Sequence, residues 1–401
     1  MAFFESAGVP SVTDALLPKC GACGLYKQCQ SPKQEVQGHG KKGILIVWEM
    51  PSPADDEQGR WGVGPAGRQL AATLWKSGVD LAEDCWMTGS LICKSSTDRP
   101  TPKQVDQCRP NMTALIKKLQ PRVILLLGAA AVRSVIAPLV AKADPGHLEK
   151  WLGWAIPSQK LNAWICPTWN PLYLFQMREE RQYPVIKLWH ERHLTQALEL
   201  EGRPWETLPN YKKQIRVEFD VRAAAQWIRD KIVDGGPVAF DYETTCLKPH
   251  NPGAEIVCCS VCWRGRETIA YPFQGEAIAA TRELLQFPCK KIGANNKFEE
   301  GWTRVHLGVE VVNWEWDCMQ SAHHLDCREG ITSVKHQAFV RFGIDEWASQ
   351  IRPYLESVDD SGLNRIKQCD VGKLLKYCAM DSLAEYLIAG SQRKEMLTCR
   401  E

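Results

Sequence analysis

Two carboxylates stand one residue apart at the end of an apolar run, in the stretch VAFDYETTCLKP (residues 238–249). In a β-strand, side chains two residues apart point to the same face, so Asp241 and Glu243 would lie side by side and repel each other. A cation between them would remove that repulsion. Taken alone, the pair also fits two solvated acids at a strand end, so a metal site needs further ligands.

Such ligands occur later in the chain. Glu299 stands at the start of a predicted helix, and Tyr377 and Asp381 are four residues apart in a helical pattern, hence on one helix face. Carboxylate oxygens suit hard divalent cations such as magnesium or manganese. Two such ions, roughly 3.5 to 4 Å apart, can activate a water and stabilise the leaving oxygen of a phosphodiester. The four acids and the tyrosine therefore predict a two-metal site.

The order of these residues resembles the DEDDy class of 3′–5′ exonucleases, most closely the proofreading domain of the polymerase I family. The family's Asp-x-Glu motif is matched by Asp241 and Glu243, and its Tyr-x-x-x-Asp motif by Tyr377 and Asp381. The resemblance covers roughly residues 214–395. It implies a ribonuclease H-like fold in which these four residues are catalytic and the acids bind two Mg²⁺ or Mn²⁺ ions.

The family's remaining motif, Asn-x-Lys-(Phe/Tyr)-Asp, is matched with one departure. Asn295, Lys297 and Phe298 occupy the expected positions, and Glu299 replaces the usual aspartate. The longer side chain moves the carboxylate by about one methylene but still supplies oxygen. The resemblance therefore implies that Glu299 is a metal ligand and that Asn295 and Lys297 contact the substrate.

Cysteines form a second group of candidate ligands. The chain has 17 of them, a high number for a protein that reads as cytosolic, where disulfides are uncommon. Cys20 and Cys23 are separated by two residues, Cys29 follows closely, and Cys93 and Cys108 come much later. Four thiolates from two distant segments can bind zinc or an iron–sulfur cluster, and spacing alone does not decide between them.

The surrounding sequence resembles the iron–sulfur branch of the uracil-DNA glycosylase superfamily. The segments that carry this resemblance are ILIVWEMPSPADDEQGRWGVGPAGRQL, the stretch containing Cys93 and Cys108, QPRVILLLGAAAV and CPTWNPLYL, in that order. It covers most of residues 15–198. It implies a 4Fe–4S cluster on Cys20, Cys23, Cys93 and Cys108, with Cys29 as the first substitute if one of these is not a ligand.

The glycosylase motifs themselves are altered. The family's water-handling acid is retained as Glu49, but Gly62 stands where an aromatic ring stacks on the extruded uracil. Gly89 replaces the asparagine that reads the uracil edge, and Asn170 replaces the histidine that stabilises the developing uracil anion. Base excision requires stacking, edge hydrogen bonds and charge stabilisation. We therefore expect a degenerate pocket without glycosylase activity.

Two α/β domains would position these residues. From about residue 43 to 200, strand and helix signals alternate, which predicts a parallel sheet covered on both faces. Prolines and a glycine without sustained periodicity indicate a linker at 202–213. The predicted domains are therefore 1–201, glycosylase-like, and 214–401, exonuclease-like. The second should contain a helix at 221–235, a strand at 237–244 and a hairpin at 255–273, followed mostly by helices.

Composition excludes several other classes. The charge is balanced, with 49 basic and 47 acidic residues, so nucleic acid would have to bind a local basic groove. No apolar run reaches the roughly 18 to 20 residues that cross a bilayer, and the N-terminus lacks the pattern of a signal peptide. A cytoplasmic protein without membrane contact is expected. Basic residues that could hold phosphates, or simply be solvated, are Lys41, Lys42, Arg60, Arg68, Lys94, Arg99 and Lys103.

The leading functional hypothesis is a 3′–5′ DNA exonuclease that proofreads single-stranded 3′ ends. The fusion of the two domains resembles parts of polymerase I-like replicases of some phages, which implies a phage protein acting in the host cytoplasm with a separate polymerase chain. Three alternatives remain: an RNA-trimming exonuclease, because ribonuclease D relatives share the motifs, an active uracil-DNA glycosylase, and a non-enzymatic scaffold that binds DNA and recruits a polymerase.

Overall fold

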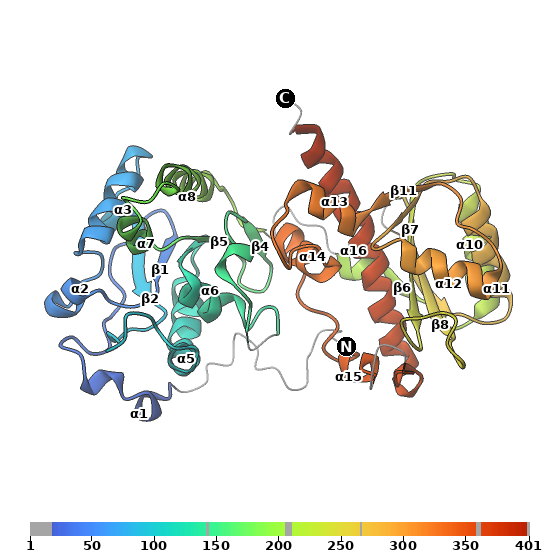
Figure 1. The fold of residues 1–401 in the computed structure, drawn as a ribbon, viewed down its shortest axis with the longest axis horizontal. Helices are drawn as coiled ribbons and strands as arrows, with labels where there is room; N and C mark the ends of the chain where they lie inside the picture. Colours follow the sequence, from blue (N-terminus) through green and yellow to red (C-terminus); the bar gives the residue numbers. More distant parts are fainter. Residues whose placement is uncertain (1–17, 142–143, 205–210, 265–266, 358–361, 399–401) are drawn as a thin grey trace. The chain divides into compact units, whose positions relative to one another are not determined.

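The computed structural model describes residues 18–141, 144–204, 211–264, 267–357 and 362–398. Their contacts divide the chain into two compact units (Figure 1). The first contains the described residues up to 204 together with Phe339–Asp345, and the second contains the other described residues from 211 onward. Each unit has its own sheet covered by helices, which confirms the predicted pair of α/β folds. Residues 205–210 of the predicted linker lie outside the described residues.

The sheet of the first unit has the strand order β2-β1-β3-β5-β4. The first four of these strands are parallel, and β4 is antiparallel to β5. Parallel neighbours require crossover connections, which the helices between the strands supply. The strands are β1 (Ile44–Trp48), β2 (Cys85–Gly89), β3 (Val123–Leu127), β4 (Ile156–Ser158) and β5 (Ala163–Thr168).

Both faces of this sheet are buried. Leu45 and Val47 of β1 belong to one apolar cluster, and Ile44 and Ile46 to another, as the two-residue period of a strand requires. Helices α5 and α6 line the first cluster, and α3 and α8 line the second. The α-helices are α1 (Cys20–Cys23), α2 (Pro53–Gln58), α3 (Pro65–Lys76), α4 (Leu81–Asp84), α5 (Pro102–Leu119), α6 (Ala129–Ile136), α7 (Pro171–Gln176) and α8 (Tyr183–Leu198).

The sheet of the second unit has the order β11-β10-β7-β8-β9-β6. Strands β7, β8 and β9 form an antiparallel meander, which includes the predicted hairpin, while β10 and β11 run parallel to β7. At the other edge, β6 is parallel to β9. The strands are β6 (Ile215–Val217), β7 (Val238–Thr244), β8 (Ile256–Cys262), β9 (Thr268–Pro272), β10 (Lys291–Gly293) and β11 (Trp314–Asp317).

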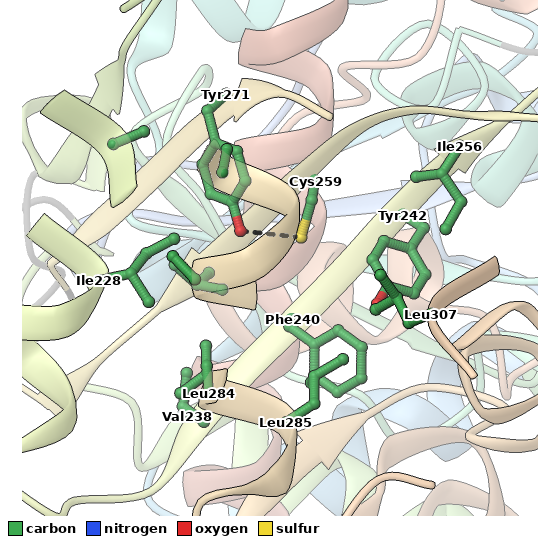
Figure 2. Packing of buried hydrophobic residues seen from close by; sticks show 14 of the residues in the cluster. Ile228, Val238, Phe240, Tyr242, Ile256, Cys259, Tyr271, Leu284, Leu285 and Leu307 are labelled. Atoms are coloured by element: carbon green, nitrogen blue, oxygen red, sulfur yellow. Dashed lines mark hydrogen bonds between the residues drawn. The ribbon is translucent and has the colours of Figure 1, made fainter. Parts of the chain in front are cut away.

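One face of the second sheet forms the main apolar core. Figure 2 shows Phe240 of β7 in this core near Leu285, and Tyr242 of the same strand near Leu307. Tyr271 donates a hydrogen bond to the Cys259 sulfur there, at 3.3 Å. Helices α10, α11 and α12 line this core, while α16 packs along β7 and β8.

The α-helices of the second unit are α10 (Val221–Ile232), α11 (Glu276–Gln286), α12 (Lys297–Leu307), α13 (Cys318–Leu325), α14 (Val334–Phe342), α15 (Arg352–Leu355) and α16 (Val371–Thr398). The end of α14, from Phe339 onward, belongs to the first unit, where the Phe339 ring meets Trp151 edge-on at 6.0 Å between centroids. Within the described part of the chain, no helix combines the length and apolar character needed to cross a membrane.

Candidate active site and cysteine cluster

Strand β7 separates its apolar and acidic side chains. Phe240 and Tyr242 point into the apolar core, so Asp241 and Glu243 must point to the other face of the sheet. Glu243 is 7% exposed, and helix α16 packs against β7 and β8. The spacing that predicts two acids side by side therefore places Glu243 in a buried position and Asp241 in a half-buried one, which argues against two fully solvated acids.

Helix α16 is held on β8 by one buried serine. The Ser260 hydroxyl donates to the carbonyl oxygen of Cys378 at 2.7 Å and lies 2.9 Å from the Ser382 hydroxyl. These contacts set the position of α16 along the sheet. As a result, the Cys378 sulfur lies 3.6 Å from Asp241 Oδ2, and Asp381, one turn further along the helix, is 3% exposed.

Glu299 enters the site from the first turn of α12, where it is 4% exposed. The turn before this helix is fixed by Asp317, whose carboxylate accepts hydrogen bonds from the backbone N–H groups of Asn295 and Asn296 at 3.1 and 2.9 Å. Asn295 has a left-handed backbone with φ of 66°, a conformation that asparagine tolerates better than most residues. Lys297 lies exposed at the helix start, where a bound strand could reach it.

Lys335 of α14 joins the site without any signal in the sequence. Its ammonium donates to both carboxylate oxygens of Asp381, at 2.6 and 2.8 Å, and to the Tyr377 hydroxyl at 3.0 Å. The Trp347 indole N–H donates to the same carboxylate at 3.2 Å. Asp381 and Tyr377 are therefore oriented by partners that are distant in sequence.

Glu385 is a fifth buried carboxylate that sequence reasoning missed. It is 2% exposed and follows Asp381 by four residues, the spacing that already joins Tyr377 to Asp381. That repeat is the signal that could have revealed it. Glu385 Oε2 and Glu299 Oε2 are buried oxygens with no hydrogen-bond partner among the described residues. Buried carboxylate oxygens without partners are costly and require an explanation.

Negative charge dominates the electrostatics of the site. Burial, reinforced by the nearby charge of Asp381, raises the pKa of Asp241 to about 8. Lys335 opposes this shift but cannot balance so many carboxylates. Burial is also the main cause, with carboxylate repulsion second, of pKa values well above the usual range for Glu243, Glu299 and Glu385.

The donor set fits hard divalent cations. Asp241, Glu243 and Cys378 each place one ligand atom within 4.8 Å of the other two. Five acids with one lysine carry four excess negative charges when ionised, which two divalent cations would neutralise. The unpartnered oxygens of Glu299 and Glu385 would then gain a cation or its bound water as a partner. We therefore assign this cluster as the candidate metal centre.

The raised pKa values predict that metal-free protein loses stability as pH rises. Folded Asp241 binds its proton more tightly than the unfolded chain, whose Asp pKa is about 4. Its contribution is therefore fully present below about pH 4 and lost as the pH rises to about 8. In chelator, the free energy of unfolding should fall by on the order of 4 kcal/mol between pH 5 and 8, measured by urea denaturation.

Asp241→Asn should reduce that loss, whereas Glu283→Gln should leave it unchanged. Glu283 is a suitable control because Arg229 binds it at the surface and lowers its pKa. Equal slopes for wild type and Asp241→Asn would contradict the assigned electrostatics.

The predicted cluster ligands meet around one pocket in the first unit. Cys20 and Cys23 of α1, Cys93 after β2, and Cys108 of α5 all line it. Apolar residues close the pocket, among them Leu25 and Leu91. The α1 segment is tied to α5 by a backbone hydrogen bond from Lys19 to Gln107. Cys29 lies close enough to Cys93 to raise its pKa, although burial is the larger cause of a value of about 12.

Two of the predicted cluster sulfurs accept hydrogen bonds. The Lys33 backbone N–H and the Asn111 amide donate to Cys93 and Cys108 sulfurs, at 3.2 and 3.5 Å. Hydrogen bonds to sulfur are a feature that tunes iron–sulfur clusters.

In the glycosylase-like pocket, both carboxylate oxygens of the retained acid, Glu49, accept hydrogen bonds from the protein. Glu49 Oε1 accepts a hydrogen bond from the Ala130 N–H at 3.1 Å, and Glu49 Oε2 accepts one from the Asn170 amide at 2.8 Å. Asn170 also caps α7 by accepting from the Leu172 N–H at 3.0 Å. Asn170 is thus a structural partner of Glu49 and of α7.

No space remains for a side chain at position 89, where the family's asparagine reads the uracil edge. A Cβ atom on Gly89 would lie 2.5 Å from the Leu91 carbonyl oxygen and 2.6 Å from the ring of Trp61. Trp61 is 3% exposed and donates to the Glu35 carbonyl oxygen at 2.9 Å. Trp61 therefore fills the space where a larger side chain at 89 would stand. The neighbouring Gly62 has φ of 74°, which disfavours an aromatic residue there.

Several of the basic residues proposed to hold phosphates have partners within the first unit. Lys41 forms an ion pair with Glu83 at 2.6 Å, and the Lys94 ammonium donates to the Ser95 carbonyl oxygen at 2.6 Å. Lys42 and Arg68 donate to the carbonyl oxygens of Gly78 and Val63. Arg60, Arg99 and Lys103 are the remaining residues of this group.

Comparison with known proteins gives a family for the first unit. Residues 37–199 match the uracil DNA glycosylase superfamily. The chain is 33% identical over 132 residues to the type-4 uracil-DNA glycosylase of Pyrobaculum aerophilum, which spans 32% of this chain and 65% of that protein. It is 30% identical over 173 residues to the Thermotoga maritima enzyme of the same name, spanning 42% and 84%. Escherichia coli RNase D, an exoribonuclease, is similar in structure at 12% identity and a TM-score of 0.36, over 46% of this chain and 45% of that one.

Proposed function

Because the chain belongs to the uracil DNA glycosylase superfamily through residues 37–199 and carries a second unit with a buried acidic centre, we propose that it is a metal-dependent 3′–5′ exonuclease. One observation carries this proposal: carboxylates from β7, α12 and α16 gather in one buried place with more negative charge than Lys335 can balance. In a purely structural core, such repulsion would only lower the stability of the folded state.

Asp241, Glu243, Glu299 and Asp381 would hold the cations. When bound, two such ions supply an activated water and neutralise the leaving oxygen of the phosphodiester. Tyr377 keeps its proton at neutral pH because burial, and then the charge of Asp381, raises the pKa of its phenol. Held by Lys335, its hydroxyl can orient a water or a phosphate oxygen by hydrogen bonding.

The proposed substrate is a single-stranded 3′ end, with Asn295 and Lys297 beside its terminal nucleotide. DNA proofreading in phage replication, in the host cytoplasm and with a polymerase on a separate chain, is the biological role that we propose for this activity. RNA trimming uses the same chemistry and is the principal alternative. The non-enzymatic scaffold does not explain the buried acids, whose mutual repulsion costs stability when no cation is bound.

A direct assay separates these possibilities. Purified full-length protein with Mg²⁺ or Mn²⁺ is incubated with single-stranded DNA, RNA, and primer–templates with a paired or mismatched 3′ end, each labelled at the 5′ end. We expect ladders that shorten from the 3′ end, with release of mononucleotides and faster attack on the mismatched end. Internal cleavage, or no cleavage in either metal, would contradict the proposal.

Uracil excision is the second candidate function, because Glu49 and the superfamily's fold are retained. We propose that this activity is lost. Trp61 closes the edge-reading position, and Asn170 replaces the anion-stabilising histidine with a group that already binds Glu49. In this proposal, the residues of the pocket stabilise the fold and do not bind a nucleobase.

Asn170→His alone is therefore expected to release no uracil. Stacking and each edge contact are worth on the order of 1 to 3 kcal/mol, and an oxyanion-type donor about 3 to 4 kcal/mol. Because these groups act as a unit, restoring one of them does not restore a proportional share of the activity. The measurement is free uracil from a uracil-containing strand, in an Asp241→Asn background that silences the exonuclease. Uracil released by that background with Asn170 unchanged would make the chain a two-activity repair enzyme.

A further inference from the structure

We propose that Cys378, with Asp241 and Glu243, forms a mixed sulfur–oxygen site for a thiophilic divalent cation such as zinc. This inference deepens the proposed function and rests on it, because the two carboxylates are those of the candidate metal centre. Neither the Asp-x-Glu motif nor the Tyr-x-x-x-Asp motif requires a cysteine at position 378. The thiol is therefore a feature of this chain that the nuclease proposal leaves unused.

The geometry places the three donors together. One ligand atom from each residue lies within 4.8 Å of the other two, and the Cys378 sulfur is 3.6 Å from Asp241 Oδ2. Metal–sulfur bonds of about 2.3 Å and metal–oxygen bonds of about 2.0 to 2.2 Å hold tetrahedral donors about 3.3 to 3.8 Å apart. Movements of about 1 Å or less would thus complete the coordination.

Two further buried carboxylates interact electrostatically with this group. Glu299 Oε2 is buried and without a hydrogen-bond partner in the described chain, and so is Glu385 Oε2. Both carboxylates interact electrostatically with Asp241. These oxygens are an independent indication that the interior of the site lacks a positively charged partner, because neither is satisfied by the protein itself.

The sulfur determines which cation binds best. Thiolate ligands favour zinc, cobalt and cadmium, whereas magnesium and manganese prefer oxygen. On binding, the thiol loses its proton to solvent as the sulfur–metal bond forms, and no oxidation state changes. Zinc would therefore compete with magnesium for Asp241 and Glu243.

Cobalt(II) provides the test, because a thiolate–cobalt bond gives charge-transfer absorption in the near ultraviolet. Full-length protein with its native cofactor content is titrated with CoCl₂, and each spectrum is subtracted from that of the same variant without cobalt. We expect the band in wild type and in Cys289→Ala, a buried cysteine of the apolar core on the other face of the sheet. The part of the band that is due to Cys378 should be lost in Cys378→Ala and in Cys378→Ser, which keeps a polar group of similar shape. Cobalt affinity should fall by a factor on the order of 10 to 100 in both.

The outcomes separate the two proposals. An undiminished band in both Cys378 variants that melt like wild type would overturn sulfur ligation, while cobalt binding that depends on Asp241 would leave the metal centre intact. Cobalt binding unaffected by Asp241→Asn would remove the metal centre and, with it, the proposed function. Cobalt held by the cysteines of the first unit would appear equally in all variants and cancel in the comparison between them.

Discussion

Replacing Asp241 with asparagine is expected to reduce nucleotide release from a 3′ end by on the order of 10³-fold, because its carboxylate lies beside Glu243 and interacts with Asp381. Asparagine keeps the shape of the side chain but removes the charge on which cation binding depends. The measurement is the initial rate of mononucleotide release from single-stranded DNA, at saturating Mn²⁺. The same variant should bind Mn²⁺ more weakly in equilibrium dialysis.

A fold defect is the alternative explanation for lost activity, and the metal-free protein distinguishes it. Removal of one of several repelling charges should raise the stability of Asp241→Asn in chelator at pH 8, not lower it. Glu283→Gln, a surface change in the same unit, should retain the wild-type rate. Undiminished digestion by a double variant lacking the charges of Asp241 and Glu243 would rule out the acidic centre as the active site.

Changing Cys93 or Cys108 to serine is expected to abolish the brown colour of the purified protein and to destabilise the first unit by several kcal/mol. The cluster would tie α1, the segment after β2 and α5 together, so its binding free energy is also folding free energy. The measurements are iron and sulfide content, visible absorption and the unfolding transition of the first unit.

Cys29→Ser is the matched control, because Cys29 lies beside Cys93 but is the substitute in the predicted ligand set. It should keep both colour and stability. If Cys29→Ser loses the cluster while a serine variant of one of the four predicted ligands keeps it, Cys29 is a ligand in place of that residue. A colourless wild-type protein with stoichiometric zinc would show that the metal itself is wrong.

Much of the fold could be predicted because it depends on short-range periodicity. Alternating strand and helix signals predict the parallel sheet of the first unit, and two consecutive strand patterns predict the β8–β9 hairpin. Both were confirmed. The alternation of Phe240, Asp241, Tyr242 and Glu243 likewise determines which side chains share a face, because successive residues of a strand point to opposite sides.

The partners of these residues depended on packing between distant segments. Lys335 reaches Asp381 from 46 residues away in sequence, and Trp61 fills the space beside Gly89 through the packing of the first unit. Phe339–Asp345 belong to the first unit although they follow most of the second in sequence. Local sequence patterns do not specify such contacts, because many sequences with the same periodicity could pack differently.

The sequence by itself therefore determined the two α/β folds and the identity of the acids and cysteines that could bind metals. The tertiary structure alone decided how these groups are buried and paired: Glu385 inside the acidic centre, Cys378 beside Asp241, and Asn170 on Glu49. The physical reason is that a residue's type and spacing set its chemistry and its face on an element. Burial and charge, which set its pKa and its partners, arise only when those faces pack together.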